Sequence, residues 1–373
     1  MTKKSIFNSI SPFLLEFCIS MSKQFTDLLL AWDEDQNDRP MPWKGEKDPY
    51  KIWLSEIILQ QTRVEQGWAY YEKFLLHFPT IFDLAKAKEE KVFKLWEGLG
   101  YYNRCRNLLF TAKLIATNYK GLFPNDYETL LSLKGVGPYT AAAIASFAFN
   151  APHAVLDGNV YRVIARYEGI DVPTDSTTGK KIFEQRAAAL LDKKRAGLYN
   201  QAIMDFGATV CKPMAPNCNA CPLQKTCVAH ATAQVNQLPI KEKQLVKKER
   251  RFYYFLLQVQ DEIWVSERKH KDIWQGLYEF YLLDAGKKML WNETSTQAFL
   301  KEQLGLSSVK LLQRSNEIKQ QLTHQVITAQ FIRVALTKKP SSMTAGKWQK
   351  ISKLKALPFP KLINQYFSET FVW

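Results

Sequence analysis

Apolar residues recur at every third or fourth position from Phe25 to about Thr232, and this spacing predicts an almost wholly helical region. Short clusters of Gly, Pro, Asn and Asp separate the helical runs, for example at 150–152. Two of the runs, 126–133 and 139–149, are joined only by a short turn that contains glycine. The first part of the chain is therefore predicted to be all-α.

Beyond this region the pattern changes to short segments rich in aromatic and β-branched residues, which are typical of strands. The predicted strands are 252–259, 262–266, 277–283 and 325–336, and the predicted helices are 294–304 and 360–367. The second part of the chain is therefore predicted to be α+β.

A chain of 373 residues exceeds what one typical core holds, so two domains are expected. We predict a poorly ordered extension at 1–20, a helical domain at 21–232, a linker at 233–251 and the α+β domain at 252–373. The linker is assigned because it is polar and holds six basic residues. No run of about 20 apolar residues occurs, so we expect no membrane-spanning segment.

The chain has an excess of basic residues, with a formal charge of +15 and a pI of about 9.3. This excess favours a polyanionic partner, and nucleic acid is the first candidate because phosphate contacts dominate such binding. A high pI also promotes solubility in the absence of any partner, so the charge supports this interpretation without establishing it.

A Gly-Val-Gly-Pro turn, residues 135–138, joins the two helices predicted around it. Gly135 and Gly137 allow a tight turn with positive φ, and Pro138 suits the first position of a helix. Backbone N–H groups at the start of the second helix can then face a phosphate oxygen. An ordinary turn in a helical bundle has the same short pattern. The motif therefore indicates DNA binding only together with other features of the chain.

Glu56 lies in the segment 52–59, where six of the eight residues are apolar. A helix that is apolar on nearly every side is buried, and no Lys or Arg lies within four residues of Glu56. Desolvation without a nearby cation raises the pKa of a carboxyl group, so Glu56 is a candidate proton donor. The alternative is a partly exposed glutamate at a helix edge.

Asp157 precedes an apolar-periodic run that begins at Val160, and it is predicted to cap that helix. Backbone N–H groups and the helix dipole favour the ionised form of a capping carboxylate. The alternative is that Asp157 serves only as a helix cap, which is enough to explain an aspartate at this position. Together, the environments of Glu56 and Asp157 are expected to push their pKa values apart, which gives the acid and the anion that cleavage of a glycosidic bond uses.

Four of the six cysteines are clustered: Cys211, Cys218, Cys221 and Cys227. Thiolates at this spacing ligate either zinc or an iron–sulfur cluster. Zinc ribbons usually have two C-x2-C pairs, whereas this segment has one. The clustering is typical of metal ligation in a reducing compartment, and we expect a cytoplasmic protein.

Together these motifs resemble those of the adenine DNA glycosylase (MutY) family, within the helix-hairpin-helix superfamily. The similarity extends from about Phe25 to the C-terminus. The matching segments are 54–62, 98–102, 135–140, 156–160 and 200–205, and the cysteine cluster follows in the expected order.

The resemblance implies that Glu56 protonates N7 of adenine and that Asp157 stabilises or captures the cationic sugar. It also implies that Tyr139 and Asn159 position this chemistry. The residues implied to contact DNA in this domain while adenine is flipped out are Gln61, Thr62, Leu99, Tyr101, Gly135 and Gly137. Ordinary helix packing is the alternative for Leu99 and Tyr101.

Two further features follow from the same resemblance. Bifunctional members of the superfamily carry a Lys where this chain has Tyr139, and a phenol cannot form the Schiff base that cuts the backbone. We therefore expect base removal without strong lyase activity. The cysteine spacing is similar to that of the family's [4Fe–4S] loop, which would span 211–227 here.

Residues 252–373 resemble the family's Nudix-like C-terminal domain, which reads 8-oxoguanine. No Arg-Glu-x-x-Glu-Glu metal box follows the segment 276–280, so nucleotide hydrolysis is not expected. Thr323 and His324 align with the family's recognition loop, although Leu322 replaces the usual Phe. The alternative for His324 is a side chain satisfied by the backbone.

We therefore predict a monomeric, monofunctional glycosylase that hydrolyses the N-glycosidic bond of adenine mispaired with 8-oxoguanine or guanine in double-stranded DNA. One alternative is an endonuclease III-like glycosylase for damaged pyrimidines, which Tyr139 and the second domain disfavour. Another is a non-catalytic module that binds damaged DNA. The presence of both Glu56 and Asp157 disfavours that module, because binding requires neither carboxylate.

Overall fold

The computed structural model describes residues 12–242, 246–306 and 308–370, with side chains described from residue 22 onward. It divides into two compact units. The helical unit comprises residues 1–82 and 110–244, and the mixed unit comprises residues 83–109 and 245–373. No helix in the described ranges combines the length and apolar character that crossing a membrane requires.

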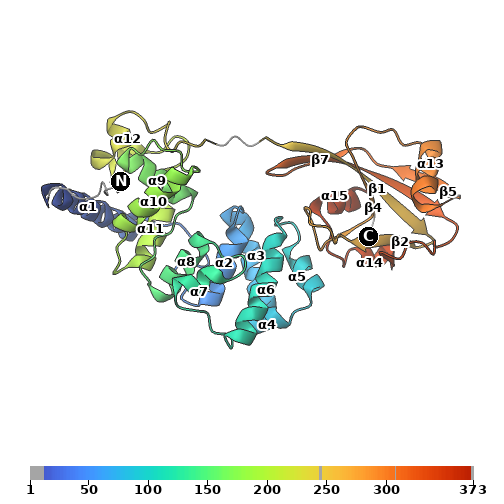
Figure 1. The fold of residues 1–373 in the computed structure, drawn as a ribbon, viewed down its shortest axis with the longest axis horizontal. Helices are drawn as coiled ribbons and strands as arrows, with labels where there is room; N and C mark the ends of the chain where they lie inside the picture. Colours follow the sequence, from blue (N-terminus) through green and yellow to red (C-terminus); the bar gives the residue numbers. More distant parts are fainter. Residues whose placement is uncertain (1–11, 243–245, 307, 371–373) are drawn as a thin grey trace, which may run out of the picture. The chain divides into compact units, whose positions relative to one another are not determined.

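Helices form nearly all of the described helical unit, as the spacing predicted (Figure 1). They are α1 (Pro12–Gln36), α2 (Pro49–Leu59), α3 (Val64–His77), α7 (Tyr127–Ser132), α8 (Pro138–Phe149), α9 (Gly158–Glu168), α10 (Thr177–Leu190), α11 (Ala196–Thr209) and α12 (Val228–Ala231), with short 3-10 turns at Cys218–Ala220 and Gln224–Thr226. Helices α4 (Ile81–Lys86) and α6 (Asn103–Asn118) cross the division, and α5 (Glu89–Trp96) belongs to the mixed unit.

The beginning of the chain differs from the expectation of a poorly ordered extension at 1–20. Residues 12–20 are the first part of α1, while residues 1–11 lie outside the described residues. Pro12 is the first residue of this helix, where its fixed φ is already helical and its missing N–H costs no hydrogen bond. The structure therefore gives residues 12–20 a helical conformation within the segment predicted as an extension.

The core of the helical unit lies between α1, α9, α10 and α11. Large apolar side chains such as Phe25, Phe183 and Phe206 fill it. Helix α8 packs against α2 and α11, and its inner residues are small, with Ala141 and Ala143 fully buried. Small side chains let helix backbones approach closely, and this brings the start of α8 next to α2.

A mixed sheet dominates the rest of the mixed unit, and the described residues contribute eight strands to it. These are β1 (Lys248–Val259), β2 (Glu262–Glu267), β3 (Tyr278–Glu279), β4 (Tyr281–Ala285), β5 (Val309–Arg314), β6 (Ile318–Gln321), β7 (Gln325–Leu336) and β8 (Lys347–Lys350), together with helices α13 (Glu293–Leu304), α14 (Ile351–Leu354) and α15 (Lys361–Thr370). The predicted strands and helices are confirmed, except that 277–283 is divided into β3 and β4.

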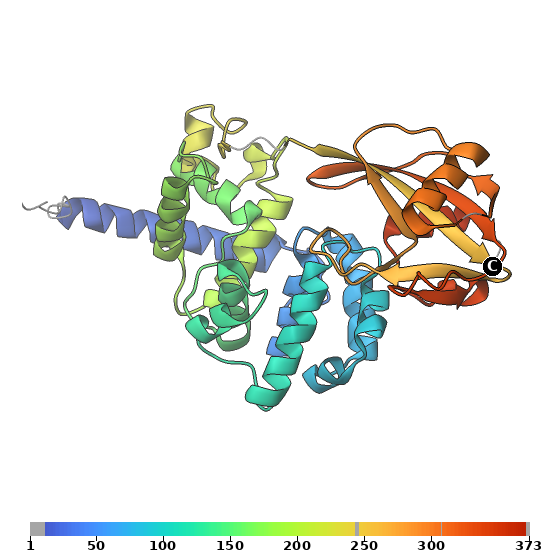
Figure 2. The ribbon, with the colours of Figure 1, turned by 45° about the vertical axis from the view of Figure 1, so that its right-hand side comes forward.

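The long strands β1 and β7 pair in parallel along most of their length at the centre of this sheet. Side chains of one face of β1, such as Phe255, pack with Trp291 and α13. On the other face Tyr254 stacks on Phe331, which stacks on Tyr366 of α15. Figure 2 shows the helices on the two sides of the sheet. Cover on both faces explains why 252–257 is a continuous buried run.

The predicted linker and domain boundary also differ in detail from the structure. Strand β1 begins at Lys248, within the predicted linker 233–251, of which residues 243–245 lie outside the described residues. The segment 83–109, which was expected in a continuous helical domain, groups with the mixed unit. There the Glu97 carboxylate accepts a hydrogen bond from the Phe359 backbone N–H at 2.8 Å.

Candidate functional site

One pocket of about 420 Å³ in the helical unit brings together six residues that the sequence analysis singled out. These are Glu56, Gln61, Thr62, Tyr139, Asp157 and Asn159. They come from α2 and the turn after it, from the start of α8 and from the start of α9. Side chains that are far apart in the sequence therefore share one cavity, as a common active site requires.

Glu56 is buried on α2, with 4% of its surface exposed, as predicted. Burial raises the pKa of its carboxyl group to about 7, and the negative charge of Asp157 adds to this. A hydrogen bond from the Tyr139 hydroxyl acts in the opposite direction because it stabilises the carboxylate. The prediction of a desolvated glutamate with a raised pKa is confirmed.

Asp157 is the N-cap of α9, as predicted. Its Oδ1 atom accepts hydrogen bonds from the backbone N–H groups of Asn159 and Val160, each at 2.8 Å. The expected effect on its acidity is wrong, however. Burial raises the pKa of Asp157, and the cap hydrogen bonds reverse only part of that rise. Capping was visible in the sequence, whereas the desolvation arises from elements packed around the site.

Tyr139 lies at the start of α8 and contacts both sides of the pocket. Its hydroxyl hydrogen-bonds the Glu56 carboxyl and also lies 4.0 Å from the Met204 sulfur. Burial and the two neighbouring carboxylates keep the pKa of this phenol well above its ordinary value. Tyr139 is therefore a neutral hydrogen-bond donor at physiological pH.

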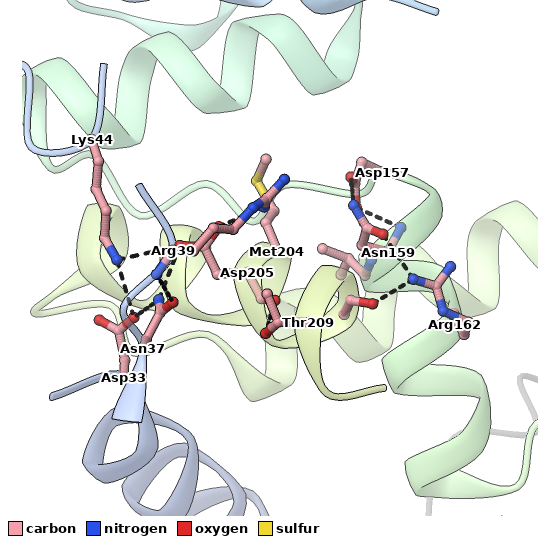
Figure 3. A network of polar contacts seen from close by, with 12 residues as sticks. Asp33, Asn37, Arg39, Lys44, Asp157, Asn159, Arg162, Met204, Asp205 and Thr209 are labelled. Atoms are coloured by element: carbon pink, nitrogen blue, oxygen red, sulfur yellow. Dashed lines mark hydrogen bonds and ion pairs between the residues drawn. The ribbon is translucent and has the colours of Figure 1, made fainter. Parts of the chain in front are cut away.

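Asn159 and Arg162 extend the pocket's polar contacts into the protein interior (Figure 3). The Asn159 amide donates to Asp157 Oδ2 at 2.7 Å, and Arg162 Nη2 donates to Asn159 Oδ1 at 2.7 Å. Arg162 also donates to the backbone carbonyls of Gly207 and Cys211, at 2.6 and 2.7 Å. This chain of hydrogen bonds holds Asp157 in a fixed orientation and joins it to the cysteine-containing loop.

The four clustered cysteines follow α11 as free thiols. Burial raises the pKa of Cys221 to about 11. The other three cysteines add smaller electrostatic contributions in the same direction. Arg166 Nη1 lies 3.4 Å from the Cys211 sulfur. Among the described residues, no three His, Cys, Asp or Glu side chains are arranged around a point that would hold a metal ion.

The glycine turn between α7 and α8 has the predicted position but only half of the predicted conformation. Gly135 has a φ of 84°, in the left-handed region that favours glycine. Gly137 instead has a φ of −98° and caps α8 in an extended conformation, with Pro138 as the first helical residue. A single left-handed residue is enough to close this turn.

The remaining predicted contacts belong to the mixed unit. Tyr101, at a φ of 48°, is 40% exposed and its hydroxyl contacts the Thr323 hydroxyl. Thr323 and His324 are exposed in the turn between β6 and β7. Leu99 is buried at 6% exposure, so its side chain packs within the protein here, as the alternative interpretation held.

Sequence reasoning missed several residues around the pocket. Arg39, Trp43, Gln201 and Met204 also line it, and the Gln201 amide nitrogen is buried without a hydrogen-bond partner in the described part of the chain. Gln201 and Met204 fall inside the matching segment 200–205, so the motif indicated their importance but assigned no role. Arg39 and Trp43 lie in an irregular loop, where no periodic pattern could identify them.

The chain is similar to known DNA repair proteins. Residues 54–186 match the HhH-GPD superfamily of base excision DNA repair proteins, and residues 253–369 match the NUDIX domain family. The chain is 35% identical over 257 residues to the adenine DNA glycosylase of Buchnera aphidicola subsp. Acyrthosiphon pisum, covering 69% of this chain and 73% of that protein.

A second relative is the adenine DNA glycosylase of Buchnera aphidicola subsp. Baizongia pistaciae, which is 32% identical over 302 residues and matches 80% of this chain and 83% of its own length. Among solved structures, a thermostable thymine-DNA glycosylase superposes with a TM-score of 0.53 at 29% identity. That match covers 57% of this chain and 98% of that chain.

Proposed function

Because this chain belongs to the adenine DNA glycosylase family, we propose that it removes adenine from duplex DNA by hydrolysing the N-glycosidic bond. The observation that carries this proposal is the pairing of Glu56 and Asp157 in one pocket. A buried acid and a nearby carboxylate are the two groups that glycosidic bond cleavage uses.

The reaction begins when adenine leaves the base stack and enters the pocket, since a stacked base cannot reach a buried carboxyl group. Glu56 then donates its proton to N7 of adenine, which neutralises the departing base. The pKa of about 7 keeps a large fraction of Glu56 protonated at neutral pH. The buried Gln201 amide nitrogen, which has no hydrogen-bond partner among the described residues, is a donor suited to an acceptor atom of the base.

Asp157 stabilises the sugar as the bond to the base breaks. Its lower ordinary pKa and its two cap hydrogen bonds make it the more easily ionised of the two carboxyl groups. The carboxylate faces the positive charge that develops at the sugar C1′, or bonds to it before water attacks. Water then delivers hydroxide to C1′, and its remaining proton returns to the carboxylate pair.

The enzyme is proposed to be monofunctional. Tyr139 occupies the position at which an amine would form a Schiff base, and its raised pKa keeps the phenol protonated. The products are therefore free adenine and an intact strand with an abasic site.

The proposed substrate is duplex DNA in which adenine lies opposite 8-oxoguanine or guanine. Thr323, His324 and Tyr101 are proposed to read the opposite base, because all three are exposed and the Tyr101 and Thr323 hydroxyls are in contact. The net charge of +15 supports binding to the phosphate backbone. Gly135, in the turn before α8, and Gly137, the N-cap of α8, are proposed to contact a backbone phosphate.

Cys211, Cys218, Cys221 and Cys227 are proposed to hold a [4Fe–4S] cluster. Four cysteine thiols within residues 211–227 match the kind and number of ligands that such a cluster takes, although the described side chains do not converge on one point. The cluster would tie the loop 211–227 together, and Arg162 and Arg166 join that loop to α9. Clustered cysteines proposed to bind a metal cluster, and not to form disulfides, also support the proposal of a reducing, cytoplasmic environment.

Three duplexes test the proposed function directly. They carry adenine opposite 8-oxoguanine, adenine opposite guanine, and thymine glycol opposite adenine. We expect strand scission only after alkali treatment, and only for the first two duplexes. Cleavage of the thymine glycol duplex, or scission without alkali, would instead support an endonuclease III-like enzyme.

A further inference from the structure

Asp205 is a fully buried carboxylate on α11 that the proposed mechanism does not use. Its Oδ1 atom forms an ion pair with Arg39 at 2.8 Å, and its Oδ2 atom lies 3.5 Å from Lys44 Nζ. The Asn37 amide donates to Oδ2 at 3.0 Å. Figure 3 shows these three side chains converging on Asp205 from the loop that follows α1. One buried anion thus holds two cations and the loop that carries them.

Both cations border the space around Glu56. Arg39 lines the pocket that Glu56 shares with Asp157. Lys44 lines a neighbouring cavity of about 200 Å³ whose wall also includes Glu56. A positive charge in such a desolvated space stabilises a carboxylate, so an unneutralised Arg39 or Lys44 would favour loss of the Glu56 proton.

The other charged and titratable groups lining these two cavities do not offer the same compensation. Besides Glu56, Arg39 and Lys44, these groups are Asp33, Glu46, Lys47, Tyr139 and Asp157. Glu46 pairs with Lys51 at 3.1 Å, and Lys47 donates to the Phe147 carbonyl at the protein surface. Asp33 lies 4.0 Å from Lys44 and holds Asn37. Asp205 alone in this network contacts both Arg39 and Lys44 through its carboxylate oxygens.

We propose that Asp205 is a positioning residue of this enzyme, which neutralises Arg39 and Lys44 at the edge of the pocket so that Glu56 keeps the proton it donates. This inference rests on the proposed function of Glu56 as the acid. Asp205 touches neither the base nor the sugar in this role. It acts on the reaction through the charge and the position of two side chains.

The pH dependence of adenine release distinguishes this role from simple structural support. In Asp205→Asn the two cations lose their counter-charge, and the midpoint at which the single-turnover rate falls should move to lower pH by on the order of one unit. The rates of variant and wild type should converge at acidic pH. In Lys44→Met the excess charge is negative, so the midpoint should move to higher pH.

Asp205→Asn and Lys44→Met can also be combined in a double-mutant cycle. The double variant Asp205→Asn/Lys44→Met should return the midpoint towards that of the wild type, because one charge of each sign has been removed. Asp205→Glu keeps the carboxylate and should retain the wild-type midpoint. Thermal unfolding and duplex binding of each variant confirm that it folds, and if Asp205→Asn does not fold, the shift in Lys44→Met decides the question.

The outcomes distinguish a failure of the role proposed for Asp205 from a failure of the proposed glycosylase function. A pH-independent loss of rate in Asp205→Asn, or an unchanged midpoint in Lys44→Met, would overturn the role of Asp205 while leaving the glycosylase activity intact. A wild-type chain that releases no adenine from any duplex would contradict the proposed function itself.

Discussion

At the scale of single residues, the local sequence predicted the burial of Glu56 because the surrounding helix is apolar on nearly every side. The cap formed by Asp157 was also visible, since a cap depends only on the next few residues. The direction of the Asp157 pKa shift was not predictable, because it arises from burial in the folded protein, which the residues next to Asp157 do not reveal. The burial of the Gln201 amide nitrogen, which lacks a hydrogen-bond partner in the described ranges, was not predictable for the same reason.

The raised pKa of Glu56 predicts how activity depends on pH. The protonated form is the acid, so the single-turnover rate of adenine release should be highest below pH 7 and fall as the pH rises through about 7. Glu56→Asp, which keeps a carboxyl group but shortens its reach, serves as a control for geometry. A rate that increases between pH 6 and pH 8 would be incompatible with Glu56 as the proton donor.

At the scale of elements, periodicity identified α8, α9 and most of the long strands, because each has one clear pattern of burial. Strands β5, β6 and β8 were not predicted from periodicity, because they are short and rich in polar, exposed residues. Periodicity also could not show how closely two helices approach. Helix α11 passes the start of α9 at Gly207, where an added Cβ would lie 2.7 Å from the Asn159 Cβ.

This close approach predicts the effect of Gly207→Ala. The methyl group would push Asn159 and Arg162 away from Asp157, so we expect a loss of stability on the order of 1–3 kcal/mol and a lower rate of adenine release. Thermal unfolding and single-turnover assays measure the two effects. Gly286→Ala is a matched control, since nothing lies within 4 Å of the added Cβ there, and it should leave both quantities unchanged.

The cysteine loop gives a second prediction at this scale. The purified protein should be brown, with absorbance at roughly 400 nm, if the four thiols hold an iron–sulfur cluster. Cys221→Ser should lose this colour, whereas Cys105→Ala, which changes a buried cysteine outside the loop, should retain it. Colourless protein with one equivalent of zinc would contradict the proposed cluster.

At the scale of the whole molecule, composition and the change of pattern near residue 251 predicted a helical part and an α+β part. The grouping of 83–109 with the mixed unit was not predictable. It depends on contacts such as that between Glu97 and the Phe359 backbone, which join segments more than two hundred residues apart. The same grouping places Tyr101 beside Thr323.

Contact between Tyr101 and Thr323 predicts a separable role for the mixed unit. Replacing Thr323 and His324 together by Ala should lower the preference for 8-oxoguanine over guanine opposite adenine by about tenfold, because two polar contacts are removed. Competition between the two duplexes measures this ratio. Thr344→Ala, at another exposed threonine of the unit, should not alter it. An unchanged ratio in the double variant would place recognition elsewhere.

The central claim is that one buried carboxylic acid delivers a proton to the departing base, and Glu56→Gln tests it most directly. The amide has nearly the same shape but is not an acid, so the single-turnover rate of adenine release should fall by roughly a hundredfold or more, while binding to the same duplex persists. Adenine release by Glu56→Gln at the wild-type rate would contradict the account.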